Sequence, residues 1–202
     1  MRKVYLISRS KLRPGEAEPD YRQLFSPLEA RRMGALLKKA VWTSTEALKA
    51  AGIEVPEAIV TATDFGCIAN SEEFLKAMKG LVDAPMKPTH FMQSTHNTIS
   101  SLLAIRLKCH GYNATYSHKG STPAIADCRG PRNSFESAFL DAYMQIALGD
   151  IDNALVGWFD ETTPDLEAAF PSVAASRAVS MVLSSEGTVE CSPENFRELC
   201  GN

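Results

Sequence analysis

The sequence of 202 residues has no long apolar run and no concentration of basic side chains. No stretch approaches the roughly 18 consecutive apolar residues of a membrane-spanning helix, so we expect no membrane span. Lysine and arginine together number 21, against 24 aspartate and glutamate residues, which leaves a net charge of −3. Because nucleic acids are bound by clustered basic side chains, this scattered and slightly acidic distribution argues against a nucleic-acid partner.

Histidine and cysteine are also scarce, with 4 and 5 residues. None of their spacings is that of zinc ligands, so we expect no metal. The odd number of cysteines and the lack of a secretory signal at the N-terminus favour free thiols in a cytoplasmic protein. The sequence also lacks GxGxxG, a P-loop and a Gly-Xaa-Ser-Xaa-Gly elbow. We therefore expect no cofactor, neither nucleotide binding nor α/β-hydrolase chemistry.

Strand and helix patterns alternate along the chain. We predict strands at 3–10, 57–64, 112–118, 153–161 and 176–186. Capping boxes at Ser26 with Glu29 and at Asn133 with Glu136 mark the starts of two of the helices between them. This alternation predicts an α/β fold, with a mostly parallel five-stranded sheet and helices on both faces. A loop without a helix joins the final two strands, so we expect the last strand to be antiparallel.

Turn signals set the boundaries of the other elements. We predict one helix from Pro27 to Gly52, shorter helices at 71–78 and 95–109, and loops at 119–132 and 162–175. The segment Ser192-Pro193-Glu194-Asn195 has the pattern of a helix start, so we expect a short helix in the tail, 190–202. Because the sequence has no internal repeat and no low-complexity tract, we expect residues 1–202 to form a single domain.

Four stretches resemble, by their order and spacing, the N-terminal half of β-ketoacyl synthases, which belong to the thiolase-like superfamily. They are RRMGALLKKAVWTSTEALKAAGI, AIVTATDFGCIANSEEFL, PTHFMQSTHNTISSLLAIRLKCHGYNATYS and SFESAFLDAYMQIALGDIDNALVGWFDE. The chain is most similar to shortened ketosynthase-like, chain-length-factor-like proteins found beside polyene pigment and fatty-acid synthesis genes. The resemblance implies a thiolase-like half, with a final strand SRAVSMVLSSEG closing it.

The resemblance also implies a site. In catalytic members a cysteine at the N-terminus of a buried helix, after the third strand, takes an acyl group from a carrier-protein thioester, and two histidines of the second half assist decarboxylation. Here, counting from the upstream strand places Gly120 at the nucleophile position, and counting back from the downstream helix places Arg132 there. Residues 121–132 resemble an insertion, and the chain ends before the histidine-bearing half. We therefore expect no complete condensing site.

Two residues of this region are candidates for a rebuilt site. Cys128 is either a relocated nucleophile, with Arg129 and Arg132 favouring its thiolate, or an ordinary loop cysteine, which is the favoured interpretation. His118 is either a general base paired with Cys128 or a polar residue at a strand end.

Further candidates lie on the flanking helices. By the resemblance, His96 and Asn97 begin a helix near the nucleophile, and Ser134 and Phe135 begin the nucleophile helix. The alternative for His96 and Asn97 is a polar, capped helix start. Carboxylates at the end of a buried strand, Asp160 and Glu161, are site residues in some α/β folds, but a solvated turn is the favoured interpretation here.

The favoured function is that of a β-ketoacyl-[acyl-carrier-protein] synthase-like subunit without condensing activity of its own. It would act like a chain-length factor, with acyl-carrier protein and a ketosynthase, or a second copy of itself, as partners. One alternative is an autonomous acyltransferase or thioesterase using Cys128 with His118. The other is a non-catalytic module that binds carrier protein or an acyl group.

Overall fold

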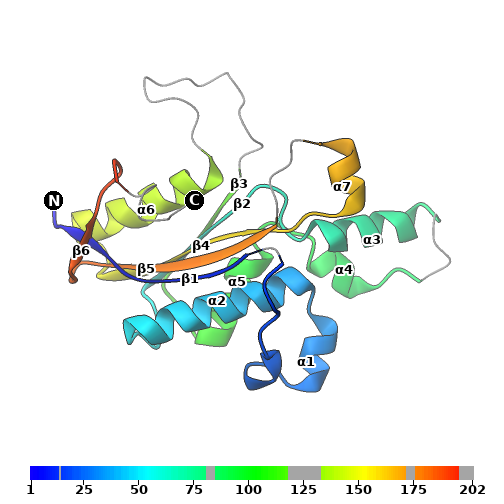
Figure 1. Ribbon diagram of the computed structural model, residues 1–202, viewed down its shortest axis with the longest axis horizontal. Helices are drawn as coiled ribbons and strands as arrows, with labels where there is room; N and C mark the ends of the chain where they lie inside the picture. Colours follow the sequence, from blue (N-terminus) through cyan, green and yellow to red (C-terminus); the bar gives the residue numbers. More distant parts are fainter. Residues whose placement is uncertain (14, 81–84, 118–132, 172–175, 196–202) are drawn as a thin grey trace.

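The computed structural model describes residues 1–13, 15–80, 85–117, 133–171 and 176–195, and Figure 1 shows a sheet with helices on both faces. The strands are β1 (Val4–Leu12), β2 (Ala58–Thr63), β3 (Tyr112–Ser117), β4 (Asn153–Asp160), β5 (Arg177–Ser184) and β6 (Val189–Cys191). The helices are η1 (Tyr21–Gln23, a 3-10 turn), α1 (Pro27–Arg32), α2 (Ala35–Ala51), α3 (Ile68–Met78), α4 (Pro88–Met92), α5 (Thr98–Leu107), α6 (Ser134–Leu148) and α7 (Pro164–Ala169). None of the helices within these ranges is both long enough and apolar enough to cross a bilayer.

The sheet confirms the predicted α/β class, but it has six described strands rather than the predicted five, because β6 adds to the edge of β1. Within the described ranges its six strands are ordered β3-β2-β4-β5-β1-β6. Strand β2 pairs in parallel with β3 and β4, whereas β5 is antiparallel to both β4 and β1. Strands β1 to β4 therefore all point the same way, and β5 is antiparallel as expected. The carboxyl ends of β1 to β4 share one edge of the sheet.

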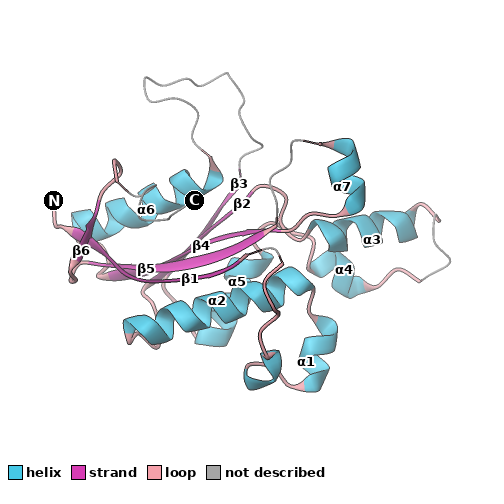
Figure 2. Ribbon diagram, viewed as in Figure 1, coloured by secondary structure: helices cyan, strands magenta, loops and turns pink. Residues whose placement is uncertain are grey.

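The two faces of the sheet carry different helices. Figure 2 shows α6 on one face and α2 with α5 on the other. Because side chains alternate along a strand, Val60 of β2 packs under α6 with Phe139, while the adjacent Ile59 packs under α2 with Leu37. Strand β2 is buried along its whole length and β4 along most of it, which fits the almost continuous apolar run of β4.

Several predicted boundaries were wrong. The helix expected from Pro27 to Gly52 is two helices, α1 and α2, because Met33 and Gly34 are both extended. Helix α5 was predicted to close on Gly111, but the left-handed residue that ends it is Lys108, with φ of 54°. Gly111 is required for another reason, since a Cβ there would lie 1.9 Å from the carbonyl oxygen of Glu57.

Other elements occur where none was predicted. Helix α4 follows a segment interpreted as a break, and α7 lies in the predicted loop at 162–175, where the Thr163 hydroxyl accepts a hydrogen bond from the Leu166 N–H at 3.1 Å. Helix α3 begins at Ile68 rather than Ser71. Strand β6 forms just before the predicted helix start at Ser192, because the outer edge of β1 offers backbone groups that Val189–Cys191 can pair with. Residues 196–202 of the predicted tail helix lie outside the described residues. The predicted loop at 119–132 lies outside the described residues.

Candidate site at the start of helix α6

The start of α6 lies at the carboxyl ends of the parallel strands and is held by its own side chains. The Asn133 side chain accepts a hydrogen bond from the Glu136 N–H at 2.8 Å, and the Glu136 carboxylate accepts one from the Asn133 N–H at 3.2 Å. This confirms the predicted capping box. Ser134 and Phe135 are both buried, and the Ser134 hydroxyl donates to the Asp64 carboxylate in the turn after β2. The first turn of α6 is therefore tied to the β2–α3 turn.

Asp160, the last residue of β4, organises that same turn. Its Oδ1 accepts hydrogen bonds from the Thr63 hydroxyl at 2.9 Å, the Asp64 N–H at 2.8 Å and the Phe65 N–H at 2.9 Å. Its Oδ2 accepts one from the Trp158 indole N–H at 3.1 Å. Asp160 is only 5% exposed, so the expectation of a solvated turn was wrong for it. Burial raises the pKa of Asp160, and the backbone donors oppose that rise.

Glu161, the residue after Asp160, also holds the β2–α3 connection. Its carboxylate accepts a hydrogen bond from the Ala69 N–H at 3.1 Å, in the first turn of α3. Burial raises the pKa of Glu161, while the nearby ammonium of Lys39 lowers it. Consecutive residues of a strand end face opposite sides of the sheet, so Asp160 and Glu161 hold two different parts of the β2–α3 connection. This residue is partly buried rather than solvated.

An aromatic stack joins α6 to strands β4 and β5. The rings of Phe135 and Trp158 are stacked, with centroids 5.0 Å apart and an interplanar angle of 7°. The Arg177 guanidinium carbon lies 3.9 Å from the centroid of the Trp158 ring. Because Trp158 also donates to Asp160, these four side chains form one connected group at the start of α6. We call Phe135, Trp158, Asp160 and Arg177 the stack cluster.

The structure brings together some of the residues predicted from the sequence. Ser134 and Phe135 meet Asp64 and the stack cluster, and His96 packs near the same turn, since a Cβ at Gly66 would lie 3.8 Å from its Cα. The Asn97 side chain is exposed and makes no capping hydrogen bond, although the Asn97 carbonyl accepts one from the Ser101 N–H at 3.0 Å. The remaining predicted positions, His118, Gly120, Cys128 and Arg132, lie outside the described residues.

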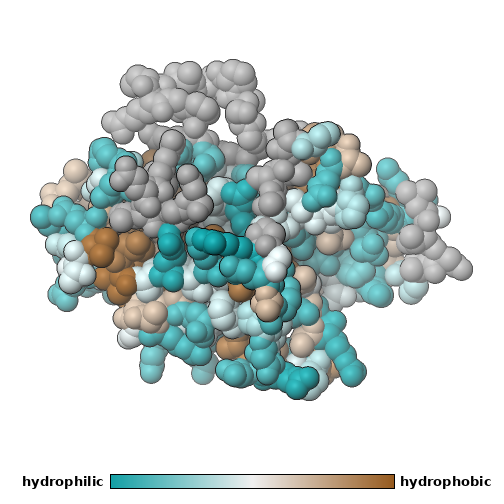
Figure 3. Space-filling view, viewed as in Figure 1, coloured by the Kyte–Doolittle hydropathy of each residue, from teal (hydrophilic) through white to brown (hydrophobic). Residues whose placement is uncertain are grey.

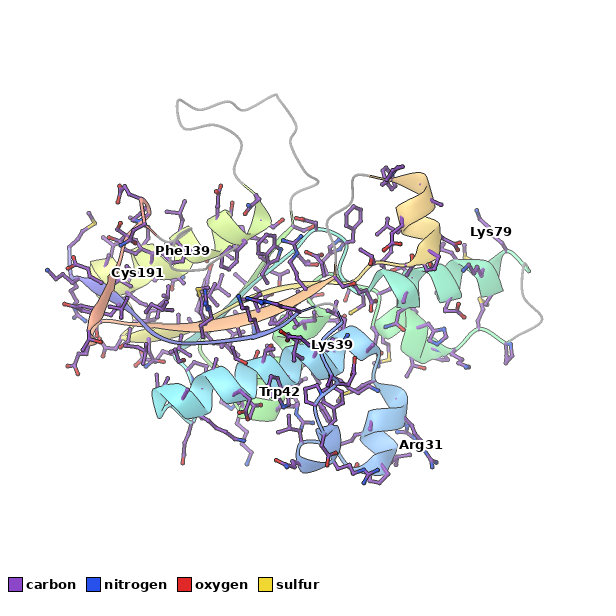
Figure 4. The ribbon with its side chains drawn as sticks, viewed as in Figure 1. Arg31, Lys39, Trp42, Lys79, Phe139 and Cys191 are labelled. Carbon is purple, nitrogen blue, oxygen red and sulfur yellow. The ribbon has the colours of Figure 1, made fainter. Side chains whose placement is uncertain are left out.

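A pocket on the α2 side of the same edge also reaches Asp160 and Arg177, two members of the stack cluster. Its volume is about 260 Å³, and it is lined by the loop after β1, the first turn of α2 and the facing ends of β4 and β5. The Lys39 ammonium in this pocket pairs with the Glu18 carboxylate at 3.0 Å (Figure 4 labels Lys39 on α2). The pocket therefore contains charged side chains of both signs, and the charges of Lys39 and Glu18 neutralise each other.

No group of side chains in the described ranges could hold a metal ion. The stack cluster and the capped start of α6 offer hydrogen-bond donors and an aromatic surface, which suit binding an organic group rather than coordinating a cation.

A family model for the β-ketoacyl synthase N-terminal domain matches residues 7–199. The chain belongs to this family. The match spans the whole sheet from within β1 onward, including the start of α6 and the stack cluster. No curated protein matches this chain.

Solved structures of the same fold are similar over most of this chain. One is described as the ketosynthase ApeO in complex with its chain length factor ApeC from Xenorhabdus doucetiae, with a TM-score of 0.68 and 16% identity over 92% of this chain and 80% of that chain. Another is described as AntDE:AntF, a type II PKS acyl-carrier protein in complex with its ketosynthase, with a TM-score of 0.71 and 12% identity over 91% and 62%.

A third similar structure is the ishigamide ketosynthase/chain length factor, with a TM-score of 0.66 and 15% identity over 90% of this chain and 62% of that chain. This chain therefore spans less than two thirds of the length of the second and third structures. At these identities the likeness establishes the thiolase-like ketosynthase fold, as the sequence resemblance implied.

Proposed function

We propose that this protein is a ketosynthase-like subunit of fatty-acid or polyene/polyketide synthesis that has no condensing activity of its own and acts like a chain-length factor. The observation that carries the proposal is the start of α6. The resemblance expects a nucleophilic thiol next to this helix, and its described first turn presents Asn133, Ser134 and Phe135 instead. The Ser134 hydroxyl is already engaged by the Asp64 carboxylate.

The described cysteines support this proposal because all three are buried in the protein. Burial, together with the nearby carboxylates of Glu161 and Asp160, raises the pKa of Cys67 to about 12. The Cys109 thiol donates a hydrogen bond to the Pro56 carbonyl at 3.1 Å. Cys191 is 3% exposed in the core under α6. A thiolate nucleophile is disfavoured at Cys67, and Cys128 and Cys200 lie outside the described residues.

The surface supports a protein partner. Large apolar side chains are exposed on α3 and α4, with exposed fractions of 47% for Leu75, 55% for Met78 and 70% for Met92. The two helices are joined by the rings of Phe74 and Phe91, whose centroids are 5.3 Å apart. Figure 3 shows a mostly polar visible face, with scattered apolar residues and one apolar patch at the left of the view. A group of large exposed apolar side chains on two adjoining helices, as on α3 and α4, is typical of a contact surface.

The partner we propose is a ketosynthase, or a second copy of this chain, with acyl-carrier protein as the substrate carrier. Support comes from the similar structures, whose descriptions name a ketosynthase with its chain length factor and an acyl-carrier protein with its ketosynthase. Strand β3 lies at the edge of the described sheet, where its outer backbone groups are available to another chain.

The proposal is tested by co-expression with a ketosynthase of the same synthesis. We expect a stable complex, and we expect Met92→Asp to weaken it, because it places a charge on the exposed α3–α4 surface. Leu28→Asp on α1 is the matched control, since Leu28 is also exposed, at 58%, but lies outside this surface. A chain that stays alone beside the ketosynthase would contradict the proposal.

Mass spectrometry after incubation with acyl-carrier thioester tests the chemistry separately. We expect no acyl adduct on this chain, with or without the partner. An adduct that disappears in Cys128→Ser would replace the proposal with the autonomous acyltransferase. Binding of carrier protein without any ketosynthase partner would instead favour the carrier-binding module.

A further inference from the structure

Arg177 is the charged residue of the stack cluster, and its guanidinium has no protein acceptor in the described structure. Arginine carries five N–H donors in a planar fork and has no acceptor of its own. The buried Nε of Arg177 has no hydrogen-bond partner among the described residues, and none of their carboxylates forms an ion pair with it. Leaving a buried donor unsatisfied destabilises the fold, more so for a charged group, so this arrangement needs an explanation.

The carboxylate closest in the sheet does not provide one. Asp160 is directly opposite Arg177 in the β4–β5 register. Its Oδ1 accepts three donors from the β2–α3 turn and its Oδ2 accepts the Trp158 indole, and among the described residues it forms no ion pair with Arg177. Asp160 therefore acts on Arg177 through the Trp158 ring that it orients, and the guanidinium remains available.

The guanidinium is also held in a fixed orientation. It lies over Trp158 at 3.9 Å, and Trp158 is itself fixed by the Phe135 ring and by its hydrogen bond to Asp160. An arginine stacked on an aromatic face keeps the plane of its fork defined, so little side-chain entropy is lost when an anion binds. A planar, pre-oriented and unpaired fork suits an anion with two or more oxygens, a carboxylate or a phosphate group.

We propose that Arg177, stacked on Trp158 beside the start of α6, is the receptor for a carboxylate- or phosphate-bearing ligand. This inference does not depend on the proposed function, because it concerns an anion site that can be measured on the isolated chain. The ligand approaches from the α6 face, since Trp158 and Phe135 both pack against the core under α6.

The fluorescence of Trp158 can be used to measure anion binding at Arg177. In a Trp42→Phe background Trp158 is the single tryptophan, because the chain has two, and Figure 4 shows Trp42 on α2, on the other face of the sheet. Inorganic phosphate and acetate are titrated at constant ionic strength against sodium chloride while Trp158 fluorescence is recorded. We expect a saturable change with either anion and none with chloride. The anion that binds more tightly identifies the chemical class of the ligand.

Three variants decide the assignment. Arg177→Gln should weaken anion binding about tenfold or more, as expected for loss of a charge-assisted pair. Arg177→Lys should bind more weakly than the unmodified chain but keep the fold, because lysine supplies a point charge without the planar fork. Arg31→Gln removes the same charge from the exposed surface of α1, away from α6 in Figure 4, and should leave binding unchanged.

The proposal is overturned if phosphate and acetate change the fluorescence no more than chloride does. It is equally overturned if Arg31→Gln weakens binding as much as Arg177→Gln. If Arg177→Gln does not fold by circular dichroism, the Arg177→Lys comparison decides, and equal affinity in that variant contradicts a planar, bidentate receptor.

Discussion

Two helices begin at the same edge of the sheet on opposite faces, and their starts are built differently. The start of α6 is closed by side chains, with the capping box of Asn133 and Glu136 and the bond from Ser134 to Asp64. The start of α2 has Gly34 as its N-cap and no side-chain cap, and its first residues, Ala35 and Leu36, line a pocket of about 260 Å³. One helix start is filled by protein groups, and the other faces open space.

The two helix starts differ in how many polar side chains surround them. Both helix starts present unpaired backbone N–H groups, and each can be satisfied by side chains or by solvent. On the α6 face the carboxylates of Asp64 and Asp160 gather around the start of the helix, whereas on the α2 face the first turn is left to the pocket. We therefore expect substitutions on the α6 side to cost much more than equivalent ones at α2.

The largest effect is expected from Asp160→Ala. It removes the acceptor for four hydrogen bonds and leaves the Thr63, Asp64, Phe65 and Trp158 donors unpaired in a buried place. We expect the free energy of unfolding to fall by about 3 kcal/mol, measured by urea denaturation. Asp165→Ala is the control, because its ion pair with Lys76 is on the surface and should matter by about 0.5 kcal/mol or less. If the two variants lowered the free energy of unfolding equally, Asp160 would not be the residue that organises the β2–α3 turn.

The same carboxylate makes stability depend on pH. Burial raises the pKa of Asp160 above its ordinary value, so the folded chain holds this proton more tightly than the unfolded chain does. The free energy of unfolding contributed by this group is therefore highest below the ordinary aspartate pKa and decreases as pH rises from that value through the raised one. Asp160→Asn should flatten this part of the pH profile, which urea denaturation at a series of pH values would show.

An intermediate effect is expected at the closed helix start. Asn133→Ala removes the side chain that accepts the Glu136 N–H and breaks the capping box. The free energy of unfolding should fall by about 1 kcal/mol. Asn133→Asp keeps the acceptor and should stay within a few tenths of a kcal/mol of the unmodified chain, as checked by thermal denaturation. A neutral Asn133→Ala would mean that Ser134 and Asp64 hold the helix start without the cap.

The smallest effect, and the opposite sign, is expected at the open helix start. Gly34 already has the extended backbone of an N-cap, with φ of −60° and ψ of 160°. Gly34→Ser should therefore cap α2 and raise the free energy of unfolding by a few tenths of a kcal/mol. The new Cβ would approach the Asn70 side chain at 3.1 Å, which a flexible side chain can relieve. Gly34→Ala adds the same Cβ without the oxygen, and a gain there would show that the cap is not the cause.

Some local signals were read correctly, because neighbouring residues contain their whole cause, although the Thr163 cap of α7 was missed. The capping box at Asn133 and Glu136 and the helix end at Gly52 were predicted, because a cap or a helix end is decided within one helical turn. The break at Gly34 was missed. Its extended conformation is supported from a distance, by the Gln93 side chain that accepts the Gly34 N–H at 3.3 Å.

The site was harder to predict for the same reason. Ser134 and Phe135 were named, but their partners Asp64, Trp158 and Arg177 are far away in the sequence and meet only at the sheet edge. From the sequence, Asp160 and Glu161 could be placed at the end of a buried strand. That position was the signal that favoured a buried role for these carboxylates over a solvated turn. Nothing local marks Arg177 as stacked and unpaired.

The sequence by itself determined the α/β class, the order of the strands along the chain, the closed start of α6 and the family resemblance, because these rest on periodicity, caps and motif order. Only the tertiary structure decided what surrounds the start of α6. Parallel strands bring their carboxyl ends to one edge, so Asp64, Asp160 and Arg177 become neighbours across more than a hundred residues. Hydrogen-bond partners and burial at that edge depend on this convergence, which is a property of the packed sheet and is not contained in any single segment.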